Sequence, residues 1–206
     1  MSSASDHIRV DHHDWHSPQY VDEWITRDFT RDEERRLRLR RMLAAAPWQA
    51  DADIKVLDVG GGYGVVTEEV LSTFPCAIVT LQDYSAPMLD QARQRLAAHA
   101  ARVKYSLADL RDPAWTTAVG GLFDLAVSAI AIHNLRDSGE IADSYRGIAA
   151  VLKPGGVFLD YDLFGLISGT DVQMQTIRDA GFATVDCLWK QERLAVIRAV
   201  RPSAAG

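Results

Sequence analysis

With 206 residues, the chain has the length of one ordinary domain with a single core, and a second full domain is not expected. Hydrophobic residues make up 48% and charged residues 24% of the sequence, as in a soluble globular protein, and no apolar run approaches the roughly 20 residues of a membrane-spanning helix. The formal net charge of −6 argues against a general nucleic-acid-binding surface, which is usually basic, and favours a small substrate.

Residues 1–50 predict a helical cap that precedes the main domain, with helices over about 18–27 and 30–45. The first residues lack an apolar segment behind a basic start, so they are not a secretory signal and a cytoplasmic location is expected. The second helix carries six arginines between positions 31 and 41, offset by acidic residues at 32–34 at near-helical spacing. This pattern favours a solvated, salt-bridged face over a phosphate-binding patch.

Histidines and carboxylates gather near the N-terminus, where His12, His13 and His16 lie beside Asp11 and Asp14. Such side chains can ligate zinc, copper or iron. Metal ligands are usually held by rigid elements, however, and this stretch precedes the first predicted helix. No metal site is therefore predicted.

From about residue 53, short β-branched runs alternate with helical patterns, which indicates βαβ units around a parallel sheet. Strands are expected at about 55–59, 77–82, 103–106, 123–129 and 156–161. Helices are expected at about 64–73, 86–100, 113–119, 139–152 and 171–180. The segment Phe123–Ile132 is nearly all apolar, as in a strand that is covered on both faces, so helices should flank both sides of the sheet.

The C-terminal part predicts an antiparallel strand pair. The apolar runs ATVDCLW and RLAVIRAV are separated only by Lys190, Gln191 and Glu192. So short a connection cannot cross over a sheet, and it must therefore form a hairpin. The two cysteines, Cys76 and Cys187, lie in or beside apolar runs with no C-x-x-C spacing, and we expect both to be reduced core residues.

The segment Lys55–Val66, KVLDVGGGYGVV, places four glycines in five positions behind a predicted strand. The dinucleotide fingerprint requires a third glycine or alanine, but this position is Val65 when counted from Gly60 and Thr67 when counted from Gly62. No Gly-Lys-Ser/Thr follows, which excludes a P-loop. The pattern that remains, D-x-G-x-G-x-G, consists of Asp58, Gly60, Gly62 and Gly64.

This loop resembles the first motif of the class I S-adenosylmethionine-dependent methyltransferases, and later segments resemble that family in the same order. Asp83 lies 21 positions after Gly62, where the family has an acidic residue that binds the ribose hydroxyls, and Asp109 in VKYSLADLRD matches the acidic position that accepts from the adenine amino group. The runs FDLAVSAIAIHNL and LKPGGVFLDYD complete a resemblance that covers about residues 53–200.

The resemblance implies a Rossmann-like, doubly wound α/β fold: a mostly parallel seven-stranded sheet with a C-terminal antiparallel hairpin and an N-terminal helical cap. Residues 51–202 would form the methyltransferase domain, with S-adenosylmethionine as cofactor. The cofactor-binding residues expected from it are Asp58, Gly60, Gly62, Gly64, Asp83, Tyr84, Met88, Asp109, Leu110 and Ser128. It also implies in-line transfer of a methyl group to a small-molecule O, N or C acceptor.

His133 is the candidate general base or acceptor contact, because it follows the carboxyl end of the fourth strand, where open α/β sheets bind ligands. Aromatic side chains before the first strand are candidates for a lid that excludes water from the sulfonium and attracts its charge. The acceptor contacts expected are Trp15, His16, Tyr20, Trp24, Asn134 and Tyr161. The connection Leu163–Thr170 is short where many relatives carry a long insertion, so the N-terminal segment could roof much of the pocket.

Two other functions are compatible with these motifs. The first is methylation of tRNA or another RNA, with residues 35–41 as a local basic patch. The second is a non-catalytic regulator that binds S-adenosylmethionine but has no acceptor site. We expect no nucleic-acid or membrane partner, and both a monomer and a homodimer are compatible with the sequence.

Overall fold

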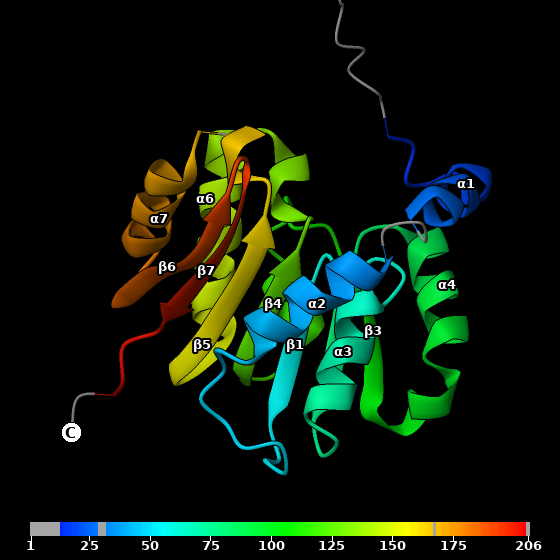
Figure 1. The fold of residues 1–206 in the computed structure, drawn as a ribbon, viewed down its shortest axis with the longest axis horizontal. Helices are drawn as coiled ribbons and strands as arrows, with labels where there is room; N and C mark the ends of the chain where they lie inside the picture. Colours follow the sequence, from blue (N-terminus) through cyan, green and yellow to red (C-terminus); the bar gives the residue numbers. More distant parts are fainter. Residues whose placement is uncertain (1–12, 29–31, 167, 205–206) are drawn as a thin grey trace, which may run out of the picture.

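A seven-stranded sheet forms the centre of the computed structural model, which describes residues 13–28, 32–166 and 168–204 (Figure 1). The strands are β1 (Lys55–Val59), β2 (Ile78–Asp83), β3 (Val103–Leu107), β4 (Phe123–Ala129), β5 (Leu152–Asp162), β6 (Thr184–Gln191) and β7 (Leu194–Val200). Their order is β3-β2-β1-β4-β5-β7-β6; the first five are parallel, and β7 is antiparallel to both of its neighbours. The fold predicted from the sequence is confirmed.

Helices cover both faces of the sheet, and each face has its own apolar core. One face carries α1 (Pro18–Asp28), α2 (Asp32–Leu43), α3 (Val65–Thr73) and α4 (Ala86–Arg95), and the other α5 (Trp115–Val119), α6 (Ser138–Val151) and α7 (Thr170–Asp179). Neighbouring strand residues alternate between the cores: Val56 faces the first and Leu57 the second, both fully buried. Burial on both faces explains why these strands read as apolar runs.

The chain leaves β1 and β4, which are adjacent, toward opposite faces of the sheet. β1 is followed by α3 on one face, whereas β4 leads through a short 3₁₀ helix, Ile132–Leu135, to α6 on the other. Divergence of two neighbouring connections opens a crevice at the carboxyl ends of the strands, and ligands of open α/β sheets bind in such a crevice.

Two boundaries differ most from those expected. The helix predicted over 86–100 ends at Arg95 and continues as a 3₁₀ helix, Ala97–Arg102. β5 begins at Leu152 rather than near 156, because Leu152 pairs with Phe123 before the register shifts and pairing resumes between Leu125 and Val157. The intervening turn contains Gly155 at φ 75°, a conformation that glycine adopts readily.

Both cysteines are free, but the prediction that they lie in the core was wrong, because both are exposed. Cys76 lies in the turn that connects α3 to β2, and Cys187 lies on the edge strand β6 beside a register shift between Cys187 and Trp189. Turns and edge strands leave one side open to solvent, which an apolar sequence run alone does not reveal.

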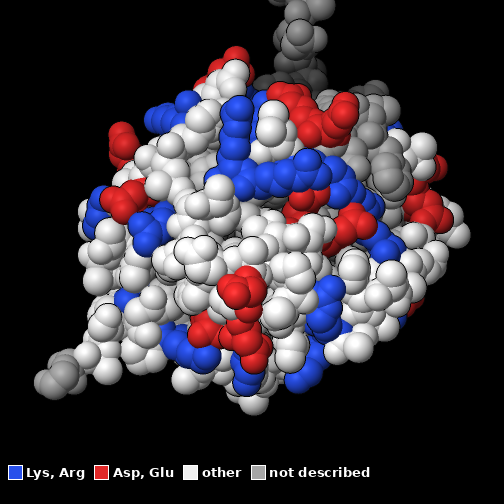
Figure 2. Space-filling view, turned by 60° about the horizontal axis from the view of Figure 1, so that its bottom comes forward, with Lys and Arg blue, Asp and Glu red and all other residues white. Residues whose placement is uncertain are grey.

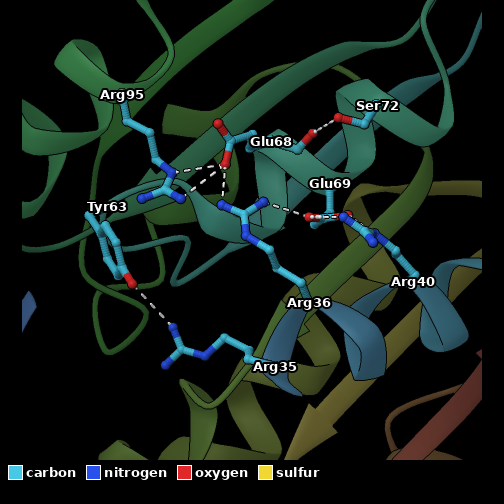
Figure 3. Close-up of polar contacts among 8 residues, drawn as sticks. All are labelled: Arg35, Arg36, Arg40, Tyr63, Glu68, Glu69, Ser72 and Arg95. Atoms are coloured by element: carbon cyan, nitrogen blue, oxygen red, sulfur yellow. Dashed lines mark hydrogen bonds and ion pairs between the residues drawn. The ribbon is translucent and has the colours of Figure 1, made fainter. Parts of the chain in front are cut away.

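The arginine-rich helix α2 is salt-bridged, but chiefly to another helix. Arg36 donates to Glu68 and to Glu69 of α3 at 2.6 Å each, and Arg40 Nε donates to Glu69 at 2.8 Å (Figure 3). Helical spacing predicts only contacts within one helix, so these partners were missed. Figure 2 shows Lys and Arg atoms bordered by Asp and Glu atoms on this side of the molecule rather than a uniformly basic surface.

None of the helices within the described ranges is both long and apolar enough to cross a lipid bilayer.

Candidate functional site

A cavity of about 270 Å³ lies at the carboxyl ends of the parallel strands. Its walls come from the loops that follow β1, β2, β3 and β4, together with the N-terminal segment and α2. The predicted residues that line it are Trp15, Trp24, Gly60, Gly62, Asp83, Tyr84, Met88, Asp109, Leu110, His133 and Asn134. These segments are distant in sequence and meet around one space only because the fold brings them together, as it does at the ligand crevice of other open sheets.

The glycine loop, residues 60–64, forms one wall, where its glycines bring the backbone close to neighbouring segments. Gly60 and Gly62 have φ values of 63° and 53°, which favour glycine. A Cβ atom on Gly60 would lie 2.6 Å from the Cβ atom of Ala131, in the loop that follows β4. A side chain at Gly60 would therefore force the two loops apart.

Gln82, which was not predicted as a site residue, ties this loop to the loop that follows β3. Its side-chain Oε1 accepts from the amide of Gly60 at 3.0 Å, and its Nε2 donates to the carbonyl of Ala108 at 2.6 Å. The side chain is buried and lines the cavity. A polar residue inside the apolar run AIVTLQD is a signal that could have identified it, because buried amides need partners.

Asp83 ends β2 with its carboxylate at the cavity. Oδ2 accepts from the amide of Gly62 at 2.9 Å and Oδ1 from the amide of Ser85 at 2.8 Å. Burial raises the pKa of Asp83 above its ordinary value, against the opposing effect of these amides. Each oxygen still has a lone pair for a further donor, so the group can accept from two ligand hydroxyls.

Asp109 lines the cavity from the loop that follows β3. It is bound by Arg111, a residue that sequence reasoning missed. Arg111 Nε and Nη2 donate to Asp109 Oδ1 and Oδ2 at 3.0 and 2.6 Å, and these hydrogen bonds lower the pKa of Asp109. The same guanidinium lies 5.9 Å from the ring centroid of Tyr84. Arg111, Tyr84 and Asp109 thus form one polar and aromatic edge of the cavity.

Three predicted cofactor residues, Asp58, Gly64 and Ser128, do not line the cavity. Asp58 is fully buried and accepts from Thr67 Oγ1 at 2.6 Å; burial raises its pKa to about 7. Gly64, at φ 89°, precedes α3, and Ser128 donates to the carbonyl of Val59 at 3.1 Å. The structure thus assigns these residues contacts that hold the loop in place.

His133 lies at the cavity and is held by a carboxylate at the end of β5. Its ring Nδ1 lies 2.5 Å from Asp162 Oδ1, and its backbone amide donates to Asp162 Oδ2 at 3.0 Å. Asp162 is fully buried and also accepts from the amide of Leu163 at 2.7 Å. Asn134 lines the cavity beside His133 and donates to the carbonyl of Ala131.

Aromatic side chains of the N-terminal segment form the wall beside the glycine loop. Trp15 and Trp24 meet edge to face with ring centroids 5.2 Å apart, and Trp24 meets Tyr63 of the glycine loop at 6.0 Å. Ser85 Oγ donates to the carbonyl of Trp15 at 2.5 Å, which fastens the segment to the start of α4.

The other predicted acceptor contacts do not line the cavity. His16 meets the ring of Tyr84 at 5.3 Å, Tyr20 contacts Trp15 at 5.4 Å, and buried Tyr161 accepts from Arg38 Nη1 at 3.0 Å. Tyr63, which the sequence did not mark as a site residue, lines the cavity, and so does Arg35, which was named only as part of a possible basic patch. Arg35 donates to the hydroxyl of Tyr63 at 3.4 Å (Figure 3). The position of Tyr63 between the glycines was a usable signal.

Among the residues that the structure describes, no group of three or more His, Cys, Asp and Glu side chains is arranged to hold a metal ion. Asp11 and His12, part of the N-terminal cluster noted in the sequence, lie outside the described residues.

Comparison with known proteins relates residues 56–156 to a family model described as a methyltransferase domain. The chain is 38% identical over 92 residues to a release factor glutamine methyltransferase of Chlorobaculum tepidum, covering 44% of this chain and 31% of the relative. It is 40% identical over 77 residues to a trans-aconitate 2-methyltransferase of Rhodopseudomonas palustris, covering 37% and 30%. The matched part is thus about a third of each relative's length.

Solved structures share the fold. An O-methyltransferase family protein from Burkholderia thailandensis superposes with a TM-score of 0.76 at 21% identity, covering 92% of this chain and 62% of that protein. An N-methyltransferase from Bradyrhizobium japonicum, solved with S-adenosyl-L-homocysteine, gives a TM-score of 0.64 at 18% identity, covering 83% and 87%.

Proposed function

We propose that the chain, which resembles the class I S-adenosylmethionine-dependent methyltransferases and whose residues 56–156 match a methyltransferase domain, transfers a methyl group to a small molecule bound in the cavity at the carboxyl ends of β1–β4. The observation that carries this proposal is the meeting of the glycine loop, Asp83, Asp109 and His133 around one space. A cofactor and an acceptor that share this space lie close enough to react.

The residues present fit S-adenosylmethionine. Gly60 and Gly62 line the cavity without side chains, so a ligand can approach their backbone. The buried carboxylate of Asp83 keeps lone pairs for hydroxyl donors. When bound, this cofactor supplies a methyl group on a positively charged sulfur. Asp83 would hold the ribose, and Asp109 with Tyr84 would hold the adenine.

The contribution of the protein to such a reaction is mainly alignment and exclusion of water. Fixing two reactants in an in-line geometry can lower a barrier by roughly 7 to 11 kcal/mol. Trp15, Trp24 and Tyr63 present apolar ring surface on the N-terminal side of the cavity. Aromatic faces also attract a positive charge, by roughly 0.5 to 2 kcal/mol.

A small acceptor is favoured over RNA by the charges of the molecule. The α2 arginines Arg36 and Arg40 donate to Glu68 and Glu69, so their charges are compensated within the protein. The net charge of −6 opposes a polyanionic partner. The names of the matched relatives point to different acceptors, so the identity of the acceptor must be found by experiment.

Calorimetric titration with S-adenosylhomocysteine tests the cofactor assignment. We expect micromolar affinity and a loss of at least about tenfold in Asp83→Ala, since two hydrogen bonds to a charged group are removed. Asp90→Ala, which changes an exposed carboxylate of α4, is the matched control and should bind as the wild type does. Binding of NAD without binding of S-adenosylhomocysteine would contradict the proposal.

Incubation of the protein with labelled S-adenosylmethionine and cell extract tests the acceptor class. We expect the label in the fraction of small molecules. Label in RNA would favour the nucleic-acid alternative, and tight cofactor binding with no transfer to any fraction would favour a non-catalytic regulator.

A further inference from the structure

Asp162 holds His133 at two points, which fixes both the position and the protonation of the ring. The carboxylate accepts from the backbone amide of His133 at 3.0 Å and lies 2.5 Å from ring Nδ1. An ionised carboxylate has no proton to donate, so Nδ1 carries the proton of this hydrogen bond. The neutral ring then has its lone pair on Nε2.

The carboxylate is itself well held. Asp162 is fully buried, and the amide of Leu163 supplies a third N–H donor at 2.7 Å. Asp160, on the same face of β5, is also fully buried; its Oδ2 accepts from the hydroxyl of Tyr145 at 3.4 Å, and its Oδ1 has no hydrogen-bond partner among the described residues. Burial and the nearby carboxylate of Asp162 raise the pKa of Asp160 well above its ordinary value.

His133 lines the cavity while Nδ1 is occupied by Asp162, and Nε2 is therefore the ring nitrogen left for a ligand. A buried carboxylate behind an imidazole orients the ring and stabilises the imidazolium that forms when Nε2 takes a proton. This arrangement serves an acceptor that loses a proton as it is methylated.

We propose that His133 is the general base for a hydroxyl acceptor, that Asp162 is its positioning residue, and that the acceptor carries this hydroxyl on an aromatic or enolic carbon. The proposal rests on the proposed methyl transfer. The hydroxyl proton passes to Nε2, the oxygen electron pair forms the new bond to the methyl carbon, and the pair of the broken carbon–sulfur bond stays on sulfur. The products are a methyl ether, a thioether and an imidazolium, so atoms and charge balance.

The need for a base favours an oxygen acceptor over a nitrogen acceptor. A neutral amine attacks a sulfonium methyl group without prior loss of a proton, so a carboxylate-backed imidazole would give it no advantage in that step. A hydroxyl gains from a base within hydrogen-bond reach, typically by about 10²- to 10⁴-fold. Trp15, Trp24 and Tyr63 line the same cavity, and their rings offer flat apolar surface to an aromatic or enolic acceptor.

The tautomer of His133 can be read without any acceptor, by nitrogen-15 NMR of histidine-labelled protein at about pH 8, above the ordinary titration range of imidazole. One-bond proton–nitrogen correlations show which ring nitrogen carries the proton, and loss of one signal set in His133→Asn assigns the residue. We expect the proton on Nδ1. A wild-type proton on Nε2 would overturn the pairing, and this result does not depend on whether any variant folds.

Asp162→Asn tests the positioning role, because an amide can present donors where the carboxylate could only accept. We expect the Nδ1 proton signal of His133 to be lost, while affinity for S-adenosylhomocysteine stays within about twofold. Asp186→Asn, an exposed carboxylate on β6, is the control and should leave the signal in place. An unchanged His133 tautomer in Asp162→Asn would refute the positioning role.

The atom that receives the methyl group tests the acceptor class. With carbon-13-labelled S-adenosylmethionine and cell extract, the chemical shift of the product methyl group distinguishes a bond to oxygen from a bond to nitrogen, carbon or sulfur. A methyl ether supports the proposal, provided that His133→Ala lowers kcat by about 100-fold with little change in KM. A methyl group on nitrogen, carbon or sulfur refutes it while leaving methyl transfer intact, whereas absence of any labelled product counts against the proposed function itself.

Discussion

Among single residues, Asp58 has the most unusual environment, a fully buried carboxyl group whose Oδ1 has no partner among the described residues. Burial raises its pKa from 3.8 to about 7, so the folded state holds a proton that the unfolded chain has released. The stability that this proton confers is full below about pH 4 and is lost as the pH rises to about 7.

We therefore expect the free energy of unfolding of the wild type to fall by about 2 to 3 kcal/mol more than that of Asp58→Asn between about pH 5 and pH 8, since one pKa unit corresponds to about 1.4 kcal/mol. Urea denaturation at the two pH values measures this difference. Asp53→Asn, an exposed carboxylate before β1, should follow the wild-type curve. Parallel curves for Asp58→Asn and the wild type would show that Asp58 is ionised throughout.

At individual positions, the sequence predicted the site residues that stand at or just after the end of a strand. Asp83 ends β2 and Asp109 follows β3, and both side chains line the cavity. Gln82 and Arg111 escaped prediction because their importance lies in hydrogen bonds to Gly60 and Asp109, which depend on side-chain orientation. The ligand contacts of all these residues stay predictions until binding is measured.

Among the elements, α2 and α3 are joined by an unusually well-paired carboxylate. The side chain of Glu69 is 3% exposed and accepts from both Arg36 and Arg40 (Figure 3). Removing one charge from a buried pair leaves its partners uncompensated, which costs roughly 3 to 5 kcal/mol when both partners are buried. Arg40 is largely exposed, so the cost here should be smaller.

We expect Glu69→Gln to destabilise the protein by about 1 to 3 kcal/mol and to speed hydrogen exchange of the α2 amides. Denaturant unfolding and exchange followed by mass spectrometry measure the two effects. Glu34→Gln, which removes the exposed partner of Arg38 within α2, should change stability by less than about 0.5 kcal/mol. Equal effects of the two substitutions would mean that α3 does not anchor α2.

The bounds of strands were predicted well where burial on both faces gives a continuous apolar run in the sequence. They were predicted poorly where pairing with a distant strand sets the end of the element. The strands β1 and β4 match their predicted bounds because their apolar runs fill both cores. The early start of β5 arises from pairing of Leu152 with Phe123, a long-range contact that local sequence does not encode.

At the scale of the whole molecule, the cavity is closed by parts of the chain that are distant in sequence. Ligand binding should therefore stabilise the N-terminal segment together with the glycine loop. At 100 times its dissociation constant, S-adenosylhomocysteine should raise the free energy of unfolding by about 2.7 kcal/mol. Hydrogen exchange should slow in α1 and in residues 60–64, whereas β6, which is remote from the cavity, serves as the internal control. Protection of the glycine loop alone would show that α1 does not sense the ligand.

The alternation of strands and helices, together with the short C-terminal hairpin, was sufficient to predict a parallel sheet with an antiparallel pair at its end and helices on both faces, but not the order of the strands. The way in which the N-terminal helices cross one face of this sheet was not predictable, because it depends on interhelical ion pairs and on Trp24 meeting Tyr63.

The aromatic side chains of residues 13–28 and the residues proposed to hold the cofactor belong to separate stretches of the chain. The two stretches meet at a few contacts, among them Ser85 with Trp15 and Trp24 with Tyr63. This division makes residues 13–28 an exchangeable cassette. We expect a variant in which this segment is exchanged and the two contacts are kept to bind the same cofactor but to accept different substrates. Engineering of this fold can therefore begin at a segment that contributes no strand to the sheet.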